Sequence, residues 1–516
     1  MLTPAILGCK HNFLEGIEMN SQTPSVSDQM AVRMAKRTDL LAMGINPYPV
    51  NFAETVDSIS KIRFDYSFLD LEADTKTEDC VTVAGRVMSI RNAGRISFAV
   101  IQSGNGDQIQ LLISRAEIGD DSHLIWRQKV DLGDHVTVTG VVATSKTGEL
   151  SIFVSVWSIV SKALRPLPNQ HSEISEETRA RQSYLDLILS EDARNQAIMR
   201  SKVISGIRSM FEKSDYIEVE TPILQTLHGG ASARPFITHS NALDNDLYLR
   251  IAPELFLKRA VVGGLDRVFE INKNFRNEGM DSTHSPEFTM LEAYQVYADY
   301  NDMADIVEAI IKESAAKASP YLNSGTLAEV KETLGNLGES WDRISLYDSL
   351  SDAAGVVIGP STPFADLETL ANARGIKVQA PTHGKLAEEL WESYVKPTLT
   401  SPTFVFDYPV DSSPLVANHR SIAGVVEKWD LYIGGMEVAT GYSELIDPII
   451  QRERLVEQAR LAGRGDDEAM VLDEAFLQAL EYGMPPTGGL GMGIDRLLMV
   501  LSAKGIRDTV LFPLVK

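Results

Sequence analysis

Two segments that alternate between apolar and polar residues, joined by a polar turn, constrain the fold of this chain more than any other feature. In the first, RVFEINKNF, every second residue from Phe269 falls on one side, and the polar series that ends at Arg276 falls on the other. The second, PEFTMLEAY, places Phe288, Glu292 and Tyr294 on a shared face. Successive side chains of a strand point to opposite faces, so the sequence predicts an antiparallel hairpin with Arg276 on its polar face.

Composition limits the partners of the protein. Its 516 residues include 48 lysines and arginines against 71 aspartates and glutamates, a net charge of −23. Such a surface repels nucleic acid and anionic membranes, so we expect a polyanion to be bound only at a local basic patch. The two cysteines, Cys9 and Cys80, lack metal-binding spacing and favour a reducing compartment, the cytoplasm. No apolar run is close to the length of about 18 residues that a membrane span needs. The first residues also lack the pattern of a signal peptide. We therefore expect no membrane partner.

Changes in residue composition and pattern along the chain predict two folded domains. A helix with a basic face is expected over 28–41, and the Val-, Ile- and Thr-rich runs between Val81 and Ser161 predict about five strands of a small barrel. The proline-bearing and acidic stretch RPLPNQHSEISEET is typical of a connector. We therefore expect a disordered extension at 1–27, a helix and barrel domain at 28–165, a linker at 166–191, and an α+β domain at 192–516 with a helical insertion around 300–400.

The polar turn of the hairpin concentrates ionisable groups. Arg276 and Glu278 stand two residues apart, and His284 begins the return. Taken alone, the turn is a surface hairpin with ordinary ion pairs, which contribute little when exposed. An arginine beside Phe275 and turn residues can instead hold a phosphate or a carboxylate through its planar guanidinium group, and Phe288 can stack on a base.

A second polar wall is predicted within KWDLYIGGMEVATGYSEL. Thr440, Tyr442 and Glu444 share one strand face, which suits a cationic or hydroxylic ligand. The glycine pair favours a β-bulge that changes the facing of the residues after it. Asp430 has an even and Glu437 an odd position in the sequence. With such a bulge, both carboxylates can reach one magnesium site. A solvated edge strand explains the same pattern equally well.

The stretch GGLGMGIDRLL predicts a glycine-rich strand that runs into a helix. Its spacing resembles a phosphate-binding loop, but it lacks the Lys and Ser/Thr of a P-loop. The glycines can serve close packing alone, whereas Arg496, in the first helical turn, offers a cation for an anion.

One face of the small barrel is a candidate for binding unpaired bases. Arg91, Phe98, Gln110 and Glu149 offer the stacking and hydrogen-bonding groups that five-stranded barrels use for single-stranded nucleic acid. Core and turn positions explain some of these residues as well.

Three of these stretches, in this order, resemble the motifs of class II aminoacyl-tRNA synthetases of the lysyl type. YIEVETPIL resembles the first motif, with Pro222 at the dimer interface; FRNEG followed by HSPEFTMLE resembles the second, and GLGMGIDRL the third. The likeness runs from about Met30 to the C-terminal TVLFPLV. It implies an N-terminal OB-fold that binds the anticodon, a class II catalytic domain with a mixed, largely antiparallel sheet flanked by helices, and a homodimer.

The resemblance also implies roles for the residues of the hairpin and the last helix. Arg276 is expected to hold the α-phosphate of ATP and the carboxylate of L-lysine, and Arg496 the γ-phosphate. Phe288 is expected to stack on adenine, with Glu278 and His284 completing the nucleotide pocket.

The lysine site that the resemblance implies begins with the α-amino group, which is expected to meet a carbonyl at Gly230 and the carboxylate of Glu254. The ε-ammonium is expected to meet Glu444 and Tyr294. Arg276, Thr440 and Tyr442 complete this site, and Mg²⁺ is expected at Asp430 and Glu437. Two positions depart from the family pattern: Thr440 stands where many relatives have asparagine, and Asp430 where they have glutamate.

The implied reaction is activation of L-lysine by ATP, followed by transfer of the lysyl group to tRNA(Lys), with no protein nucleophile. Three alternatives stay open: an aspartyl- or asparaginyl-type synthetase, a paralogue that attaches lysine to a protein, and a catalytically inactive tRNA-binding protein. An aspartyl- or asparaginyl-type synthetase needs basic groups where the side chain of its substrate binds. A paralogue that attaches lysine to a protein usually lacks the barrel, and an inactive relative typically loses an arginine or an acid.

Overall fold

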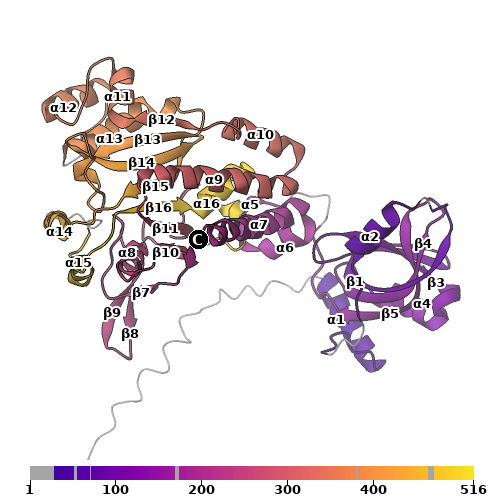
Figure 1. Ribbon diagram of the computed structural model, residues 1–516. Coiled ribbons are helices and arrows are strands. Elements are labelled where there is room, and N and C mark those ends of the chain that lie inside the picture. Colours follow the sequence, from indigo (N-terminus) through magenta and orange to yellow (C-terminus); the bar gives the residue numbers. More distant parts are fainter. Residues whose placement is uncertain are drawn as a thin grey trace, which may run out of the picture. The chain divides into compact units, whose positions relative to one another are not determined.

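The computed structural model describes residues 28–50, 55–69, 71–168, 174–378, 382–462 and 470–515, so the extension predicted at 1–27 lies outside the described residues. The chain divides into two compact units (Figure 1). One unit runs to Ser175 and includes Tyr184–Leu189, and the other comprises Glu176–Ser183 and Ser190–Lys516.

The first unit is built around a closed five-stranded barrel, as the strand pattern predicted, in the order β1-β2-β3-β5-β4. Its strands are β1 (Lys76–Ala93), β2 (Ile96–Gln102), β3 (Gln108–Ser114), β4 (His135–Thr144) and β5 (Leu150–Ser161). The predicted basic helix is α1 (Asp28–Ala42), and it is followed by α2 (Ile59–Ser67), α3 (Arg115–Ile118) and α4 (Asp120–Lys129). Helix α4 adds the fully buried Trp126 to the apolar core of the barrel.

The second unit is organised by an eight-stranded sheet in the order β12-β13-β14-β15-β16-β11-β10-β6. Its strands are β6 (Ile217–Glu218), β10 (Arg267–Phe275), β11 (Glu287–Val296), β12 (Asp342–Ser345), β13 (Thr403–Pro409), β14 (Val425–Ile433), β15 (Met436–Ser443) and β16 (Thr487–Gly493). Only the two end pairs are parallel, which confirms the mixed, largely antiparallel sheet. A small separate sheet consists of β7 (Leu224–Gln225), β8 (Ile237–Ser240) and β9 (Asn245–Leu249).

Helices cover this sheet in two groups (Figure 1). One large apolar core joins the sheet to α7 (Glu191–Lys213), α9 (Tyr300–Ala318), α10 (Ser324–Leu334) and α16 (Ile494–Ser502). A second core joins β13 and β14 to α11 (Leu346–Ala354), α12 (Phe364–Ala373) and α13 (His383–Tyr394).

The remaining helices are short or lie at the borders of the sheet. They are α5 (Glu176–Arg181), α6 (Ser183–Leu189), α8 (Glu254–Val262), α14 (Pro448–Ala462), α15 (Glu474–Glu481), α17 (Ile506–Thr509) and the 3₁₀ turns η1 (Ser319–Tyr321), η2 (Lys396–Thr398) and η3 (Val410–Ser412). Across the described ranges, no helix is both long and apolar enough to cross a membrane.

The predicted hairpin is confirmed as β10 and β11, in a register that sets Asn274 opposite Phe288 and Glu270 opposite Glu292. Its polar face is covered as well as its apolar face, because Glu270, Asn272 and Asn274 are buried. Water-excluding walls strengthen electrostatic interactions, so this arrangement is typical of a binding site rather than of a surface hairpin.

The prediction of a β-bulge at the glycine pair was wrong in its position. Gly434 and Gly435 have φ values of +57° and +74° and form the two-residue turn between β14 and β15, a conformation that glycine adopts without strain. The bulge lies beyond the turn, where Leu431 pairs with Ala439 but the next residue pairs with Glu437, which leaves Val438 as the extra residue. This bulge has the effect that was expected of the glycines: it turns the side chain of Glu437 toward the same space as Asp430.

Candidate active site

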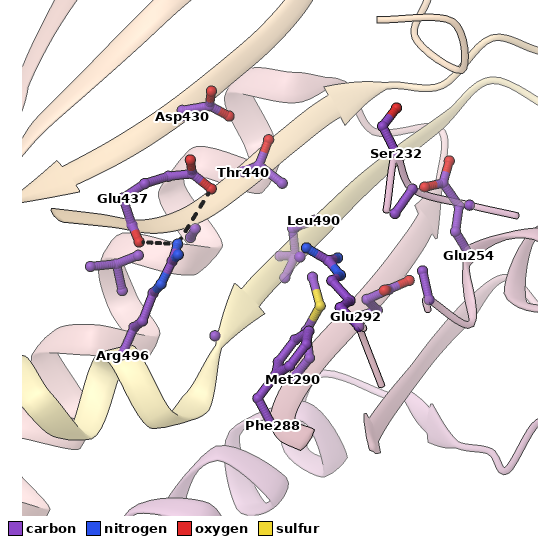
Figure 2. A pocket seen from close by; sticks show the side chains of 18 of the residues that line it. Ser232, Glu254, Phe288, Met290, Glu292, Asp430, Glu437, Thr440, Leu490 and Arg496 are labelled. Carbon is purple, nitrogen blue, oxygen red and sulfur yellow. Dashed lines mark hydrogen bonds and ion pairs between the residues drawn. The ribbon is translucent and has the colours of Figure 1, made fainter. Parts of the chain in front are cut away.

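The central strands of the second unit carry a cavity of about 330 Å³ (Figure 2). Most of the side chains predicted for one site line it together: Gly230, Glu254, Arg276, Glu278, His284, Phe288, Tyr294, Asp430, Glu437, Thr440, Tyr442 and Arg496. They come from β11 and the turn before it, from β14 and β15, from the first turns of α8 and α16, and from the loop between β7 and β8. Glu444 alone among the predicted cavity residues does not line it.

Arg276 follows the last residue of β10 and is a half-buried cation of the cavity. The guanidinium carbon lies 5.1 Å from the centre of the Phe288 ring. Burial lowers the pKa of Arg276, and the nearby carboxylates of Glu278, Glu292 and Glu437 partly offset this shift. Its Nε atom has no hydrogen-bond partner within the described residues. A buried guanidinium with an open donor is costly unless an anion binds, so this end of the cavity fits a phosphate or a carboxylate.

Arg496 supplies a second cation from the first turn of α16. Nη1 donates to the backbone oxygen of Glu437 at 2.8 Å and lies 3.8 Å from Glu437 Oε1 (Figure 2). Nη2 lies 3.0 Å from His284 Nε2. Because His284 Nδ1 is 2.8 Å from Asp281 Oδ2, Nδ1 carries the proton and Nε2 accepts from Arg496.

Asp430 and Glu437 form an acidic wall opposite these cations. Asp430 pairs with Thr440 across β14 and β15, and both acids line the cavity. Burial and the charge of Asp430 raise the pKa of Glu437, as expected for two acids that share one space. Lys428 Nζ lies 3.0 Å from Asp430 Oδ2.

The donor set of this wall fits magnesium better than a metal that needs a full protein cage. Within the described residues, no group of three or more His, Cys, Asp or Glu side chains is placed to hold a metal ion. Magnesium is commonly held by one or two carboxylates together with substrate phosphates, and Asp430 and Glu437 offer this pair.

The opposite end of the cavity is acidic and hydroxylic. Glu254, the first residue of α8, is buried beside Gly230. Gly230 has a φ of +84°, and a Cβ atom added to it would lie 3.1 Å from Glu254 Cβ, so a larger residue would be strained there. The hydroxyl of Tyr294 donates to Glu292 Oε2 at 3.3 Å. Burial, and then the charge of Glu254, raise the pKa of Glu292 well above its ordinary value. The sequence placed Glu292 on the face of Tyr294, but we assigned it no role, although strand parity was a sufficient signal.

Glu444 lies behind this acidic end and is fully covered. Its Oε2 is 2.5 Å from Lys258 Nζ, and the same ammonium is 2.7 Å from Glu254 Oε1. Burial raises the pKa of Glu444, and the Lys258 ammonium opposes the shift. Sequence reasoning missed Lys258; the only signal was its position four residues after Glu254 on one helix.

The glycines of β16 allow these side chains to approach one another. A Cβ atom on Gly489 would collide with Glu444 Oε1 and lie 2.7 Å from Tyr294 Cε1, and one on Gly491 would lie 2.5 Å from the end of Met290. The interpretation of this motif as close packing is therefore confirmed, and the packing it permits belongs to the cavity.

A polar clamp ties α7 to β11 and to α16. Arg200 Nη1 lies 2.6 Å from Asp495 Oδ1, and Nη2 donates to Thr289 Oγ1 at 2.8 Å. Asp495 Oδ2 accepts the backbone N–H of Thr289 at 2.7 Å. Because Thr289 follows Phe288 and Asp495 precedes Arg496, the clamp fixes the aromatic ring and the second cation relative to each other.

In the barrel, the four predicted residues lie outside the apolar core. Arg91 pairs with Phe98 in the register of β1 and β2, with its guanidinium carbon 4.6 Å from the ring centre. On the neighbouring strand, Gln110 Oε1 accepts from Ser151 Oγ at 3.0 Å, and Glu149 is exposed in the turn before β5. They therefore follow one outward path across β1, β2, β3 and the start of β5.

Comparison with known proteins decides the family. The family described as "tRNA synthetases class II (D, K and N)" matches residues 175–516, and an "OB-fold nucleic acid binding domain" matches residues 81–160. The chain belongs to the class II tRNA synthetases. As a member of this family it is an ATP-dependent ligase, and the predicted fold, an OB-fold domain with a class II catalytic domain, is confirmed.

Full-length relatives of this class II synthetase carry the name lysine–tRNA ligase. One from Kineococcus radiotolerans is 55% identical over 493 residues, 95% of this chain and 97% of that protein. One from Mycolicibacterium gilvum is 56% identical with the same coverage. The lysylphosphatidylglycerol biosynthesis bifunctional protein LysX of Rhodococcus opacus is 42% identical over 97% of this chain, which spans 44% of that longer protein.

Proposed function

We propose that this protein is a lysine–tRNA ligase. It activates L-lysine with ATP, giving lysyl-adenylate and pyrophosphate, and then transfers the lysyl group to the 3′-terminal ribose of tRNA(Lys) with release of AMP. The observation that carries the choice of lysine is the acidic end of the cavity, where Glu254 and Glu292 line the wall with Tyr294, and Glu444 lies directly behind.

Lysine selection follows from the cost of burying charge. An ammonium group removed from water needs a carboxylate partner, and a carboxylate in a closed pocket needs a cation. In our proposal the α-amino group binds Glu254 and the carbonyl of Gly230, the ε-ammonium binds Glu444 and Tyr294, and Thr440 and Tyr442 form the side wall. A neutral or shorter amino acid leaves Glu444 Oε1 without a donor, which costs several kcal/mol by order of magnitude.

ATP occupies the end of the cavity where the two arginines lie. Phe288 stacks on adenine, Arg276 holds the α-phosphate together with the lysine carboxylate, and Arg496 holds the γ-phosphate. The open Nε donor of Arg276 supports this role. His284 and Glu278, which line the same part of the cavity, complete the nucleotide pocket.

Asp430 and Glu437 are the residues that would hold Mg²⁺, which supplies charge neutralisation on the phosphates of ATP. Asp430 is shorter than the glutamate usual in the family, and its oxygen is 3.0 Å from Lys428 Nζ. Thr440, opposite Asp430, keeps a hydroxyl where many relatives have an amide.

The chemistry needs position and charge rather than a protein nucleophile. The lysine carboxylate attacks the α-phosphorus in line and pyrophosphate leaves. Arg276 and Arg496 offset the charge that develops on the phosphate oxygens. The 3′-hydroxyl of the tRNA ribose then attacks the lysyl carbonyl, and AMP leaves.

The barrel provides the surface for the anticodon. Phe98, backed by Arg91, offers a stacking platform, and Gln110 and Glu149 offer hydrogen bonds along the same outward path. Stacking on aromatic side chains is the usual way in which such barrels bind unpaired bases. These contacts also let an acidic protein bind a polyanion at one local surface.

A homodimer formed through the segment around Pro222 is part of this proposal. Apolar side chains of this segment and of the adjacent small sheet are exposed: Ile217, Ile223, Leu224, Leu227 and Ile237. A cluster of exposed apolar residues is typical of an interface. We place the enzyme in the cytoplasm, where its substrates occur and where the cysteine content fits.

The alternatives are disfavoured by particular residues. An aspartate-specific site needs basic groups at the side-chain end, where Glu444 and Tyr294 lie, and an inactive relative would have lost an arginine or an acid that this cavity keeps. A paralogue that modifies a protein usually lacks the barrel, which is present here as β1–β5.

Exchange of labelled pyrophosphate into ATP tests the proposal, with each standard amino acid supplied separately. We expect stimulation by lysine alone, and no stimulation by lysine would contradict the proposed function. Glu444→Gln should raise the KM for lysine far more than the KM for ATP, because the substitution removes the charge that the ε-ammonium needs.

A further inference from the structure

Lys258 is a buried cation that belongs to no step of the reaction described above. It lies on α8, its side chain is completely covered, and its Nζ contacts Glu254 Oε1 at 2.7 Å and Glu444 Oε2 at 2.5 Å. The same nitrogen lies 3.4 Å from the backbone oxygen of Leu415. One ammonium thus contacts both carboxylates that are proposed to bind the two amino groups of lysine.

The geometry separates Lys258 from the space where a ligand would bind. Glu254 and Tyr294 line the cavity, whereas Lys258 does not, so the ammonium reaches the acids from the side away from it. Glu444 Oε1 is buried without a hydrogen-bond partner among the described residues. It faces the position of Gly489, where Tyr294 also approaches closely. Lys258 contacts only Oε1 of Glu254 and Oε2 of Glu444, so one oxygen of each acid is not held by Lys258.

Two buried carboxylates that share a site cannot both stay ionised without a cation between them. Lys258 is the only lysine or arginine in the described part of the chain with an ion pair to Glu254 or Glu444. Without its charge, one of the two acids would take up a proton. A protonated Glu444 would lose the charge that attracts an ammonium group.

We infer that Lys258 is a positioning residue for substrate selection: it holds Glu254 and Glu444 from behind as ionised carboxylates, each with one oxygen turned to the amino groups of lysine. The inference rests on the proposed function, because it needs lysine as the substrate. It assigns specificity to a side chain that contacts no substrate.

The expected pH dependence follows from the groups that face Glu444. These are Lys258 and Glu254 from α8 and Tyr294 from β11, with Tyr442 on β15 two residues before Glu444. Burial raises the pKa of Glu444 and the Lys258 ammonium opposes this shift, so loss of the Lys258 charge raises the pKa further. The ionised form then appears only at higher pH, so the lysine KM should be high at neutral pH and fall as the pH increases.

Lysine-dependent pyrophosphate exchange, measured between about pH 6.5 and 9, a range in which the substrate ε-amino group stays charged, tests this inference on the full chain. Lys258→Met keeps the side-chain volume and removes the charge. We expect its lysine KM at neutral pH to rise about tenfold or more, the scale of a broken buried pair, with an ATP KM close to that of the wild type. Lys258→Arg keeps the charge and should keep the wild-type pH profile, even where its larger group raises the KM.

Lys162 provides a matched control. It is also completely covered and lies between two carboxylates, with Nζ 2.5 Å from Asp131 Oδ2 and 2.8 Å from Asp134 Oδ2, in the barrel unit. Lys162→Met should lower thermal stability without changing the lysine KM or its pH profile.

The outcomes distinguish failure of the proposed function from failure of the inference about Lys258. If the wild-type enzyme shows no lysine-dependent exchange, the proposed function fails. If the wild type responds to lysine but Lys258→Met keeps its lysine KM and pH profile, the inference about Lys258 is overturned. A shifted profile in Lys258→Arg would also overturn it, so the test holds even if the methionine variant does not fold.

Discussion

The guanidinium carbon of Arg276, in the turn after β10, lies 5.1 Å from the centre of the Phe288 ring on β11. The cation therefore covers an aromatic face that, in the proposed function, also receives adenine. Phe288→Leu removes this face but keeps an apolar side chain. Base–aromatic stacking contributes about 1–3 kcal/mol, so we expect the ATP KM to rise roughly tenfold in pyrophosphate exchange, with little change in the lysine KM.

Phe256 gives a matched control for this prediction. It carries a similar contact, with the guanidinium carbon of Arg259 at 4.8 Å from its ring centre, but it does not line the cavity. Phe256→Leu should leave both KM values near those of the wild type. Equal increases in the ATP and lysine KM values of Phe288→Leu would assign the ring a general packing role.

The contacts of Arg200 with Asp495 and Thr289 predict an effect on ATP from a residue outside the cavity. Arg200→Met breaks a pair in which Asp495 is buried. The loss of one partner leaves the acid uncompensated, at a cost of about 3–5 kcal/mol. Phe288 and Arg496 then lose their fixed spacing, so we expect a lower melting temperature and an increase in the ATP KM that exceeds the increase in the lysine KM.

Arg208 is the control for the clamp, because it lies on the same helix and pairs with Glu218 at 2.9 Å on the surface. Exposed pairs are worth about 0–1 kcal/mol, and Arg208→Met should change neither the melting temperature nor the KM values appreciably. If Arg200→Met lowers stability but leaves the ATP KM unchanged, the clamp serves the fold alone.

The acidic wall predicts a magnesium requirement that depends on two side chains. Chelation by EDTA should abolish exchange, and Glu437→Gln or Asp430→Asn should raise the Mg²⁺ concentration needed for half-maximal rate about tenfold or more, because each removes an anionic oxygen ligand. Asp305→Asn, which alters only a surface pair with Arg343, should not. An unchanged Mg²⁺ requirement in both wall variants would place the metal elsewhere.

Strand parity explains why much of the cavity could be predicted from the sequence. Once two alternating segments form a hairpin, the facing of Arg276, Phe288 and Tyr294 follows from the backbone alone. Strand alternation also placed Glu292 correctly on the face of Tyr294. The sequence does not reveal that this face is closed to water, and it is burial that raises the pKa of Glu292.

The parts that sequence could not predict depend on contacts between distant elements. Lys258 meets Glu444 only because α8 packs beside the end of β15, and the i, i+4 spacing to Glu254 is equally common on solvated helices. The bulge at Val438 likewise could not be located, because two glycines satisfy a hairpin turn as readily as a bulge. Tertiary packing decides between such local alternatives.

The outward path on the barrel predicts a separation between the two half-reactions. Phe98→Leu or Glu149→Gln should lower the kcat/KM of tRNA charging about tenfold, the scale of one lost stacking contact, while lysine-dependent pyrophosphate exchange stays at the wild-type rate. The separation is expected because the barrel and the cavity belong to different compact units, and adenylate formation uses residues of the second unit alone. Val156, an exposed side chain on β5, offers a neutral control in Val156→Ala. Comparable losses in both assays would mean that these residues stabilise the protein rather than bind the anticodon.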